Sequence, residues 1–294
     1  MTSLELINAL TGGHFQSEGL KVQLEAGNSG TAALQQLLAG RCEIARVHAI
    51  DLFKAYARQK APIVAIANLE HDVNYMIASS KERPVASAAE LRGKRVGVFT
   101  VGSTADNYLE LLLRKAGVPS DQVERQQIPI SPAAFVHVSQ GRLDALVLTH
   151  EIVLALEQAK EPIHAWSLAP YFRMPGRSYV TRRDVLKERP ELLLAFVRGM
   201  VASVREIAKG PIDPIVERAT SGYTMPTFKT KELTDAVVAS NVAHWLDRGP
   251  NNILRNIPED WQDARLELTS SGLAPIPADV QLFTNEMIDQ ALAK

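Results

Sequence analysis

Residues 15–47 read FQSEGLKVQLEAGNSGTAALQQLLAGRCEIARV, a pattern that predicts a strand, a glycine turn, a helix and a second strand. Residues 19–25 alternate apolar and polar side chains at a period of two, as a half-buried strand does. Residues 31–38 carry apolar side chains at helical spacing, and Gly40 follows them as a stop signal. Residues 42–47 are short and half apolar, so we expect a second strand parallel to the first. Strand–helix–strand units of this kind build open α/β sheets.

The turn between the first strand and the helix is the first candidate ligand site. Ligands of open α/β sheets bind at the carboxyl ends of the strands. The unpaired N–H groups at the start of the following helix carry partial positive charge. We therefore expect the residues of this turn to face a small ligand, namely Asn28, Ser29, Gly30 and Thr31.

A second glycine turn, at residues 100–104, again separates a predicted strand from a predicted helix. Each turn could be an ordinary helix start without a ligand. Because two turns stand in corresponding positions of two halves of the chain, we favour a shared binding site in a cleft between them. The residues that this turn would contribute are Gly102, Ser103 and Thr104.

The length of the chain favours two domains, since 294 residues exceed the size at which one core usually suffices. We expect an α/β fold of two lobes, each a mostly parallel sheet flanked by helices. Residues 1–80 and 180–294 would form lobe 1, which includes a helical C-terminal part with its last helix at 277–293. Residues 81–179 would form lobe 2. Two crossings between the lobes imply a hinge.

Composition excludes several classes of function. The net charge of −1 gives no electrostatic footprint for nucleic acid or an anionic membrane. The single cysteine, Cys42, excludes an intramolecular disulfide and a cysteine-rich metal site, and we expect it to pack in the core rather than act as a nucleophile. No apolar run reaches the roughly 18 residues of a membrane helix. Residues 1–10 lack the features of a signal peptide, which taken literally predicts a cytoplasmic protein.

Further candidate ligand residues follow the predicted strands. His48 and His150 each come after a strand, where they would donate hydrogen bonds across the cleft or else be ordinary solvated histidines. Asn68 and Thr149 end two other predicted strands. Arg177 stands at the return to lobe 1, and we expect it to pair with an anionic ligand.

The chain resembles the substrate-binding proteins of ABC importers. The runs GHFQSEGLKV (residues 13–22) and GTAALQQLLAG (residues 30–40) are similar to the opening of that family, and AELRGKRVGV (residues 89–98) is similar to its entry into the second domain. Within the family the resemblance is to the nitrate, sulfonate and taurine group and to its thiamine-pyrimidine relatives, the NMT1/THI5-like proteins. The run FTNEM (residues 283–287) resembles the YTNE ending of the thiamine-pyrimidine branch.

This resemblance implies a type II periplasmic-binding-protein fold that closes by hinge bending. It implies capture of a small polar or anionic organic molecule, such as a pyrimidine, a thiamine precursor or a sulfonate. It also implies a monomer in the periplasm, with an ABC permease in the membrane as partner and no nucleic acid, metal or cofactor. The family places a strand before its first helix, and that strand is missing here. We therefore expect that the start was placed too late or trimmed, together with a signal peptide.

The alternative function is that of an enzyme on the same fold, of the thiamine-pyrimidine synthase, decarboxylase or desulfinase type. The resemblance implies that the synthases carry a lysine that holds pyridoxal phosphate and a histidine four residues later. Val47 and Asp51 stand at those positions, and the cysteine run of the synthases is also missing. We therefore expect a binding protein rather than an enzyme.

Overall fold

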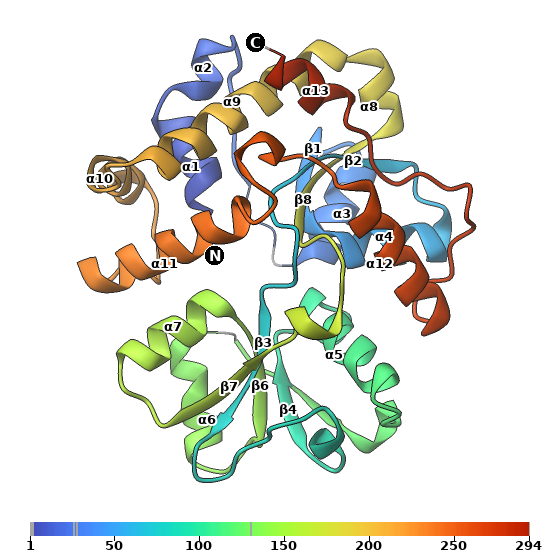
Figure 1. Cartoon of the computed structure of the whole chain (residues 1–294), viewed down its shortest axis with the longest axis vertical. Helices are drawn as coiled ribbons and strands as arrows, with labels where there is room; N and C mark the ends of the chain where they lie inside the picture. The colour runs from blue at the N-terminus through green and yellow to red at the C-terminus, as the bar shows by residue number, and fades with distance from the viewer. Residues whose placement is uncertain (1–2, 26, 28, 130, 294) are drawn as a thin grey trace.

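The structure is a computed structural model that describes residues 3–25, 27, 29–129 and 131–293. It consists of two lobes, one above the other in Figure 1, and each lobe is built around its own sheet. Lobe 1 contains the sheet of order β1-β8-β2, and lobe 2 contains the sheet of order β5-β4-β6-β3-β7. The chain passes from lobe 1 into β3 and returns from lobe 2 into β8, so it crosses between the lobes twice.

Lobe 1 is a small sheet surrounded by helices. Strand β8 lies between β1 and β2 and is antiparallel to both. All six residues of β2 are buried, as its unbroken apolar sequence predicts. The strands are β1 (Ile44–His48), β2 (Ile63–Asn68) and β8 (Arg177–Arg182). The helices are α1 (Leu4–Thr11), α2 (His14–Ser17), α3 (Gly30–Leu38), α4 (Ala49–Gln59), α8 (Arg183–Glu188), α9 (Pro190–Lys209), α10 (Asp213–Gly222), α11 (Lys231–Trp245), α12 (Pro258–Ser270) and α13 (Glu286–Leu292), with the 3-10 turn η5 (Pro250–Asn252).

Lobe 2 is a mixed five-stranded sheet. Strand β4 is parallel to β5 and β6, whereas β3 is antiparallel to β6 and β7. The strands are β3 (Tyr75–Ser80), β4 (Arg95–Val98), β5 (Glu124–Gln127), β6 (Ala145–Thr149) and β7 (Ile163–Ser167). The helices are α5 (Thr104–Lys115), α6 (Val136–Ser139) and α7 (His150–Gln158), with the 3-10 turns η1 (Ala89–Leu91), η2 (Ser120–Gln122), η3 (Pro132–Phe135) and η4 (Ala169–Tyr171).

The expected α/β fold is confirmed, but the expected mostly parallel sheets are wrong in detail. Residues 19–25 form no strand, although Leu20, Val22 and Leu24 pack half-buried against the core of lobe 1 as their alternation predicts. Alternation decides which side chains are buried, whereas a strand also needs a neighbour for its backbone. The neighbour of β1 is β8, which enters lobe 1 from lobe 2 and therefore runs antiparallel to it.

The crossing between the lobes comes earlier than expected. A boundary at residue 80 would place β3 in lobe 1, but its hydrogen bonds place it inside the sheet of lobe 2. The polar residues after β3 form a turn in which Ser80 and Arg83 pair as an isolated bridge. The division into two moving bodies at residues 80 and 180 stays a prediction, and the strand pairings favour boundaries near residues 74 and 176.

The C-terminal part is helical, with one exception. Helix α9 begins at Pro190 as predicted, because the missing N–H of proline costs nothing in a first helical turn. The last predicted helix, at 277–293, is wrong in its first half, since only α13 forms. Before it, Leu282 and Thr284 hydrogen bond with Ala65 and lie along β2 as a bridge. The backbone N–H and C=O groups of this segment thus hydrogen bond to the edge of β2 instead of forming hydrogen bonds within a helix.

The apolar core links the two lobes. One cluster contains Leu52 and Phe53 of α4 together with Tyr108 and Leu112 of α5, so it continues from lobe 1 into lobe 2. Cys42 is partly buried against this cluster, and burial raises the pKa of its thiol. Across the described part of the chain, none of the helices combines the length and the apolar character needed to cross a membrane.

Candidate ligand-binding site between the lobes

The two glycine turns meet at the boundary between the lobes. The hydroxyl of Thr31 donates a hydrogen bond to the carbonyl of Gly102 over 3.2 Å. A Cβ atom on Gly30 would clash with the Asp51 carboxylate and lie 3.0 Å from the Thr104 hydroxyl. Glycine is therefore the residue that lets these groups approach. The structure brings the predicted turns together, and their part in ligand binding stays a prediction.

Several polar groups of the two turns already form hydrogen bonds with the helices that follow them. Ser29 caps α3 by accepting from the Ala32 N–H at 3.1 Å, and Ser103 caps α5 by accepting from the Asp106 N–H at 3.4 Å. The Gly102 N–H donates to Asp106 Oδ2 at 2.7 Å, so it is not the bare donor that the sequence predicted. Asn28 lies outside the described residues.

Asp51 connects the two lobes at the centre of this contact. It stands in the first turn of α4 and is 3% exposed. From α5, Thr104 Oγ1 donates to Asp51 Oδ2 at 2.6 Å, and Asn107 Nδ2 donates to Oδ1 at 2.9 Å. Lys54 also hydrogen bonds to Asn107. Burial raises the pKa of Asp51 to about 6, although its hydrogen bonds and Lys54 oppose the shift.

Arg177 forms a buried ion network that also spans the lobes. Its Nη1 donates to Glu70 Oε1 at 2.7 Å and to Glu151 Oε1 at 3.2 Å, and its Nη2 donates to Glu151 Oε1 at 3.2 Å. Glu70 follows β2 in lobe 1, whereas Glu151 lies in the first turn of α7 in lobe 2. The amide of Asn74, turned so that its oxygen faces Arg177, accepts from Nη1 at 3.3 Å and from Nη2 at 2.9 Å.

The pKa values of the two carboxylates, Glu70 and Glu151, shift in opposite directions in this network. Burial raises the pKa of Glu70, although the Arg177 charge opposes the shift. Burial by itself would raise the pKa of Glu151 as well, but the Arg177 charge and hydrogen bonds outweigh it and lower that pKa to about 2. Within the described residues, Glu70 Oε2 and Glu151 Oε2 are buried without a hydrogen-bond partner. The network therefore holds acceptor atoms that lack a donor.

Aromatic rings from both lobes pack beside this network. His48 ends β1 and is the cross-strand partner of Arg177. Its ring centroid lies 5.3 Å from that of Tyr75 and 5.8 Å from that of Tyr108, and the two tyrosines are 5.3 Å apart. Burial, with help from the charges of Arg177 and Arg46, lowers the pKa of His48 well below its usual value. This shift favours the neutral form of the His48 imidazole.

A second polar contact joins α7 of lobe 2 to α11 of lobe 1. His150 Nδ1 and Ser240 Oγ are hydrogen bonded at 2.9 Å, and His244 Nδ1 lies 3.1 Å from Asp72 Oδ1. The rings of His150 and His244 meet edge to face with centroids 5.9 Å apart. His150 thus lies at the boundary, as the sequence predicts.

Two predicted residues are less well placed for a ligand. Asn68 is fully buried inside lobe 1, where it accepts from the Ser178 hydroxyl at 2.8 Å. The continuous apolar strand that ends at Asn68 is buried on all sides, and its last residue is buried with it. Thr149 ends β6 opposite Tyr75 and is half-buried beside the start of α7.

The acidic and aromatic residues of the site are not among those that the sequence predicted. Asp51, Glu70 and Glu151 each come within three residues of a strand end, which was the signal that singled out His48 and His150. The same rule applied to carboxylates would have found them. Tyr75 and Tyr108 gave no such signal, because an aromatic residue in a strand or on an apolar helix face is usually core.

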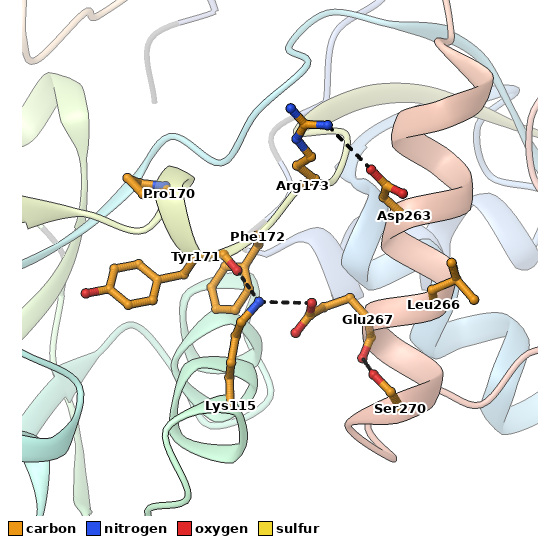
Figure 2. A pocket seen from close by; sticks show the side chains of 9 residues that line it. All are labelled: Lys115, Pro170, Tyr171, Phe172, Arg173, Asp263, Leu266, Glu267 and Ser270. Carbon is orange, nitrogen blue, oxygen red and sulfur yellow. Dashed lines mark hydrogen bonds and ion pairs between the residues drawn. The ribbon is translucent and has the colours of Figure 1, made fainter.

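A separate cavity of about 550 Å³ lies on the outside of the lobe boundary (Figure 2). Helix α12 forms one side, and the end of α5 with residues 170–173 forms the other. Lys115 spans it by donating to the Tyr171 carbonyl at 2.6 Å and to Glu267 Oε2 at 3.0 Å. Leu266 is more than half exposed on its wall.

The two-lobed α/β architecture, closed by polar contacts, defines a protein of the periplasmic-binding-protein fold class. The family described as NMT1/THI5 like matches residues 2–213, which is more than half of the sequence. The chain belongs to this family, as its resemblance to importer substrate-binding proteins predicted.

Solved structures show the same fold at low sequence identity. A protein from Bordetella bronchiseptica RB50 superimposes with a TM-score of 0.78 at 21% identity, over 98% of this chain and 92% of that chain. The periplasmic nitrate-binding protein NrtA from Synechocystis PCC 6803 gives 0.70 at 13% identity, over 99% and 85%. The alkanesulfonate-binding protein SsuA from Xanthomonas axonopodis pv. citri, bound to MOPS, gives 0.69 at 16% identity, over 93% and 91%. No curated protein sequence matches the chain significantly.

Proposed function

We propose that this protein is a solute-binding protein that captures one small polar organic molecule between its lobes and delivers it to an ABC permease. The observation that carries the proposal is the set of hydrogen bonds that bind lobe 1 to lobe 2 through polar side chains. Asp51 accepts from Thr104 and Asn107, and Arg177 bridges Glu70 and Glu151. Opening the lobes would release these groups to a ligand, and closing would bring them together around it.

The segments that cross between the lobes support a hinge. The Gly176 N–H donates to the Glu70 carbonyl at 2.8 Å, so the outgoing and returning crossings touch. A Cβ atom on Gly176 would clash with the Asp72 carbonyl and lie 2.9 Å from Glu70 Cβ, so a glycine is needed at this approach. Two adjacent crossings of the chain form an axis about which lobe 2 can rotate once the contacts between the lobes open.

The remaining parts of the proposal come from the family. NrtA and SsuA are described as nitrate-binding and alkanesulfonate-binding proteins, which makes uptake of a small solute the expected role here. We propose a periplasmic monomer that works with a membrane permease. Pyrimidines, thiamine precursors and sulfonates are the first ligands to test.

The experiment is isothermal titration calorimetry of the purified protein against pyrimidines, sulfonates, dicarboxylates and amines of similar size. The expected result is a ligand that binds with one molecule per chain and a micromolar or smaller Kd. A protein that binds none of these molecules would not be a solute-binding protein. Small-angle X-ray scattering with the bound ligand would add a check on closure, since a hinged protein becomes more compact.

A further inference from the structure

The charge of the site points to one class of ligand. This inference rests on the proposed function, because it concerns the molecule that the lobes enclose. Three observations carry it, namely the occupied donors of Arg177, the unpaired oxygens of its two carboxylates and the rings beside them.

Arg177 has no free terminal nitrogen for an anion. Its Nη1 faces Glu70, Glu151 and Asn74, and its Nη2 faces Glu151 and Asn74. An arginine that binds an anionic ligand presents two parallel donors to it. Here the donors are directed at the protein's own carboxylates, so a sulfonate or carboxylate ligand would have to displace them. The anion would also face the two negative charges that remain.

Two carboxylates share one guanidinium at this place. Glu70 and Glu151 both accept hydrogen bonds from Arg177, at 2.7 Å and 3.2 Å. The charges of Arg46 and His244 also act on Glu70. Lys54 approaches Asp51 from the same helix, and Arg46 is paired with Glu5 at 3.0 Å. Neutral His48 adds no positive charge. A buried carboxylate that lacks a partner is costly, and a positive charge placed beside it removes that cost.

The unpaired oxygens show where a donor is lacking. Glu70 is 1% exposed and Glu151 is 4% exposed, and the second oxygen of each has no hydrogen-bond partner among the residues described. Native proteins leave few buried acceptors unpaired, and such atoms often mark a site for a missing group. The two carboxylates come from different lobes, so a ligand held between the lobes can reach both.

The rings provide a surface that attracts cations. Tyr75 is only partly buried, and its ring packs at a tilt against those of His48 and Tyr108, with centroid distances of 5.3 Å. His48, which packs against this ring, is the cross-strand partner of Arg177, so the ring lies close to the ion network. The face of a tyrosine ring attracts a cation placed over it.

We infer that the interlobe site binds a small organic cation, whose positively charged nitrogen lies against the carboxylate oxygens of Glu70 and Glu151 that Arg177 leaves unpaired and near the ring of Tyr75. The nitrogen would donate hydrogen bonds to the unpaired oxygens, or would lie against them if it is fully alkylated. The rest of the molecule would contact the rings of Tyr75 and His48.

The test is a titration of the wild-type protein with a panel of matched size that differs in charge. The panel contains benzylamine, benzyltrimethylammonium, choline, benzyl alcohol, 4-amino-5-hydroxymethyl-2-methylpyrimidine, phenylmethanesulfonate and taurine. The inference predicts that the tightest ligand is one of the first three, at least tenfold tighter than any neutral or anionic compound. A neutral or anionic compound that binds tightest would overturn the inference and leave the proposed function standing. Binding of no compound would overturn both.

The variants Glu70→Gln and Glu151→Gln test the location of the charge. Each should weaken the cation at least tenfold while the affinity for benzyl alcohol changes less than twofold, since the neutral compound has no charge to lose. Glu191→Gln on the exposed start of α9 is the matched control and should change neither affinity. An unchanged cation affinity in both variants would overturn the inference. If a variant does not fold, the order of affinities that the wild-type protein shows for the ligand panel tests the inference without it.

Discussion

The hydroxyl of Thr104 in lobe 2 lies 2.6 Å from the carboxylate of Asp51 in lobe 1 and donates a hydrogen bond to it. This bond lies where the helices that follow β1 and β4 start, next to the two glycine turns. Opening the lobes would break it and expose both groups to water. The Asp51–Thr104 bond is therefore a probe of the closed state that single substitutions can test.

Replacing Thr104 with valine should weaken the contact between the lobes. Valine keeps the shape of threonine but cannot donate, so Asp51 Oδ2 loses a donor while it is buried. We expect the free energy of unfolding to fall by about 1–3 kcal/mol, as for other buried acceptors left without a partner. Urea unfolding measures this change. Thr220→Val on the exposed face of α10 is the control, and equal effects at the two sites would contradict the role of the bond.

Adding a methyl group at Gly30 should prevent full closure. In Gly30→Ala the new Cβ atom would clash with Asp51 and crowd Thr104. Relieving that overlap costs about 1–3 kcal/mol, which favours a more open arrangement. Small-angle X-ray scattering should then show a larger radius of gyration. Gly222→Ala, where a Cβ atom meets nothing within 4 Å, should scatter like the wild-type protein. Identical scattering of all three proteins would show that Gly30 does not limit closure.

The Asp51 carboxyl should make stability depend on pH. Its pKa is about 6 in the folded protein and 3.8 when exposed, so the folded state binds more protons between these values. Stability from this group is therefore greatest below about pH 4 and is lost as the pH rises through 6, by about 2–3 kcal/mol. Asp51→Asn removes this contribution. Urea unfolding from pH 4 to pH 7 should show a wild-type-minus-variant difference that falls by that amount, with exposed Asp279→Asn as the control. A difference that stays constant across this range would contradict the raised pKa.

Removing the charge of Arg177 should destabilise the protein strongly. In Arg177→Met, Glu70 and Glu151 would stay buried without their cation. Breaking a buried pair in this way costs about 3–5 kcal/mol. Chemical unfolding at pH 7 should detect the loss, and Arg205→Met at an exposed position of α9 should change stability by less than about 0.5 kcal/mol. A fully stable Arg177→Met protein would show that the network contributes little.

Local sequence patterns predicted the elements and the meeting of the two glycine turns. Helical spacing gave α3 and α9, and each turn comes directly before a helix, with Thr31 and Gly102 at one boundary. The strand predicted at residues 19–25 was wrong, because alternating apolar side chains do not provide a neighbouring strand for the backbone to hydrogen bond with. The prediction of mostly parallel sheets was wrong for a related reason. The direction of β8 relative to β1 depends on the crossing from lobe 2, which no local pattern contains.

The chemistry of the site depends on contacts that no local pattern contains. Arg177 is 107 residues from Glu70 and 26 residues from Glu151. The pairing of β2 with β8 brings Glu70 to Arg177 within lobe 1, whereas Glu151 reaches it from lobe 2. A carboxylate after a strand is usually solvated, so Glu70 and Glu151 gave no sign of burial in the sequence. Arg177 was expected to bind an anionic ligand, whereas the structure shows it held by these two residues.

The most direct test of capture between the lobes is to titrate the tightest ligand of the panel into three proteins, namely the wild type, Tyr75→Leu and Tyr171→Leu. Tyr75 belongs to the interlobe site, whereas Tyr171 lines the outer cavity of Figure 2. The proposal predicts one molecule per chain, a Kd at least tenfold weaker in Tyr75→Leu, and an unchanged Kd in Tyr171→Leu. A ligand that loses affinity only in Tyr171→Leu would contradict binding between the lobes.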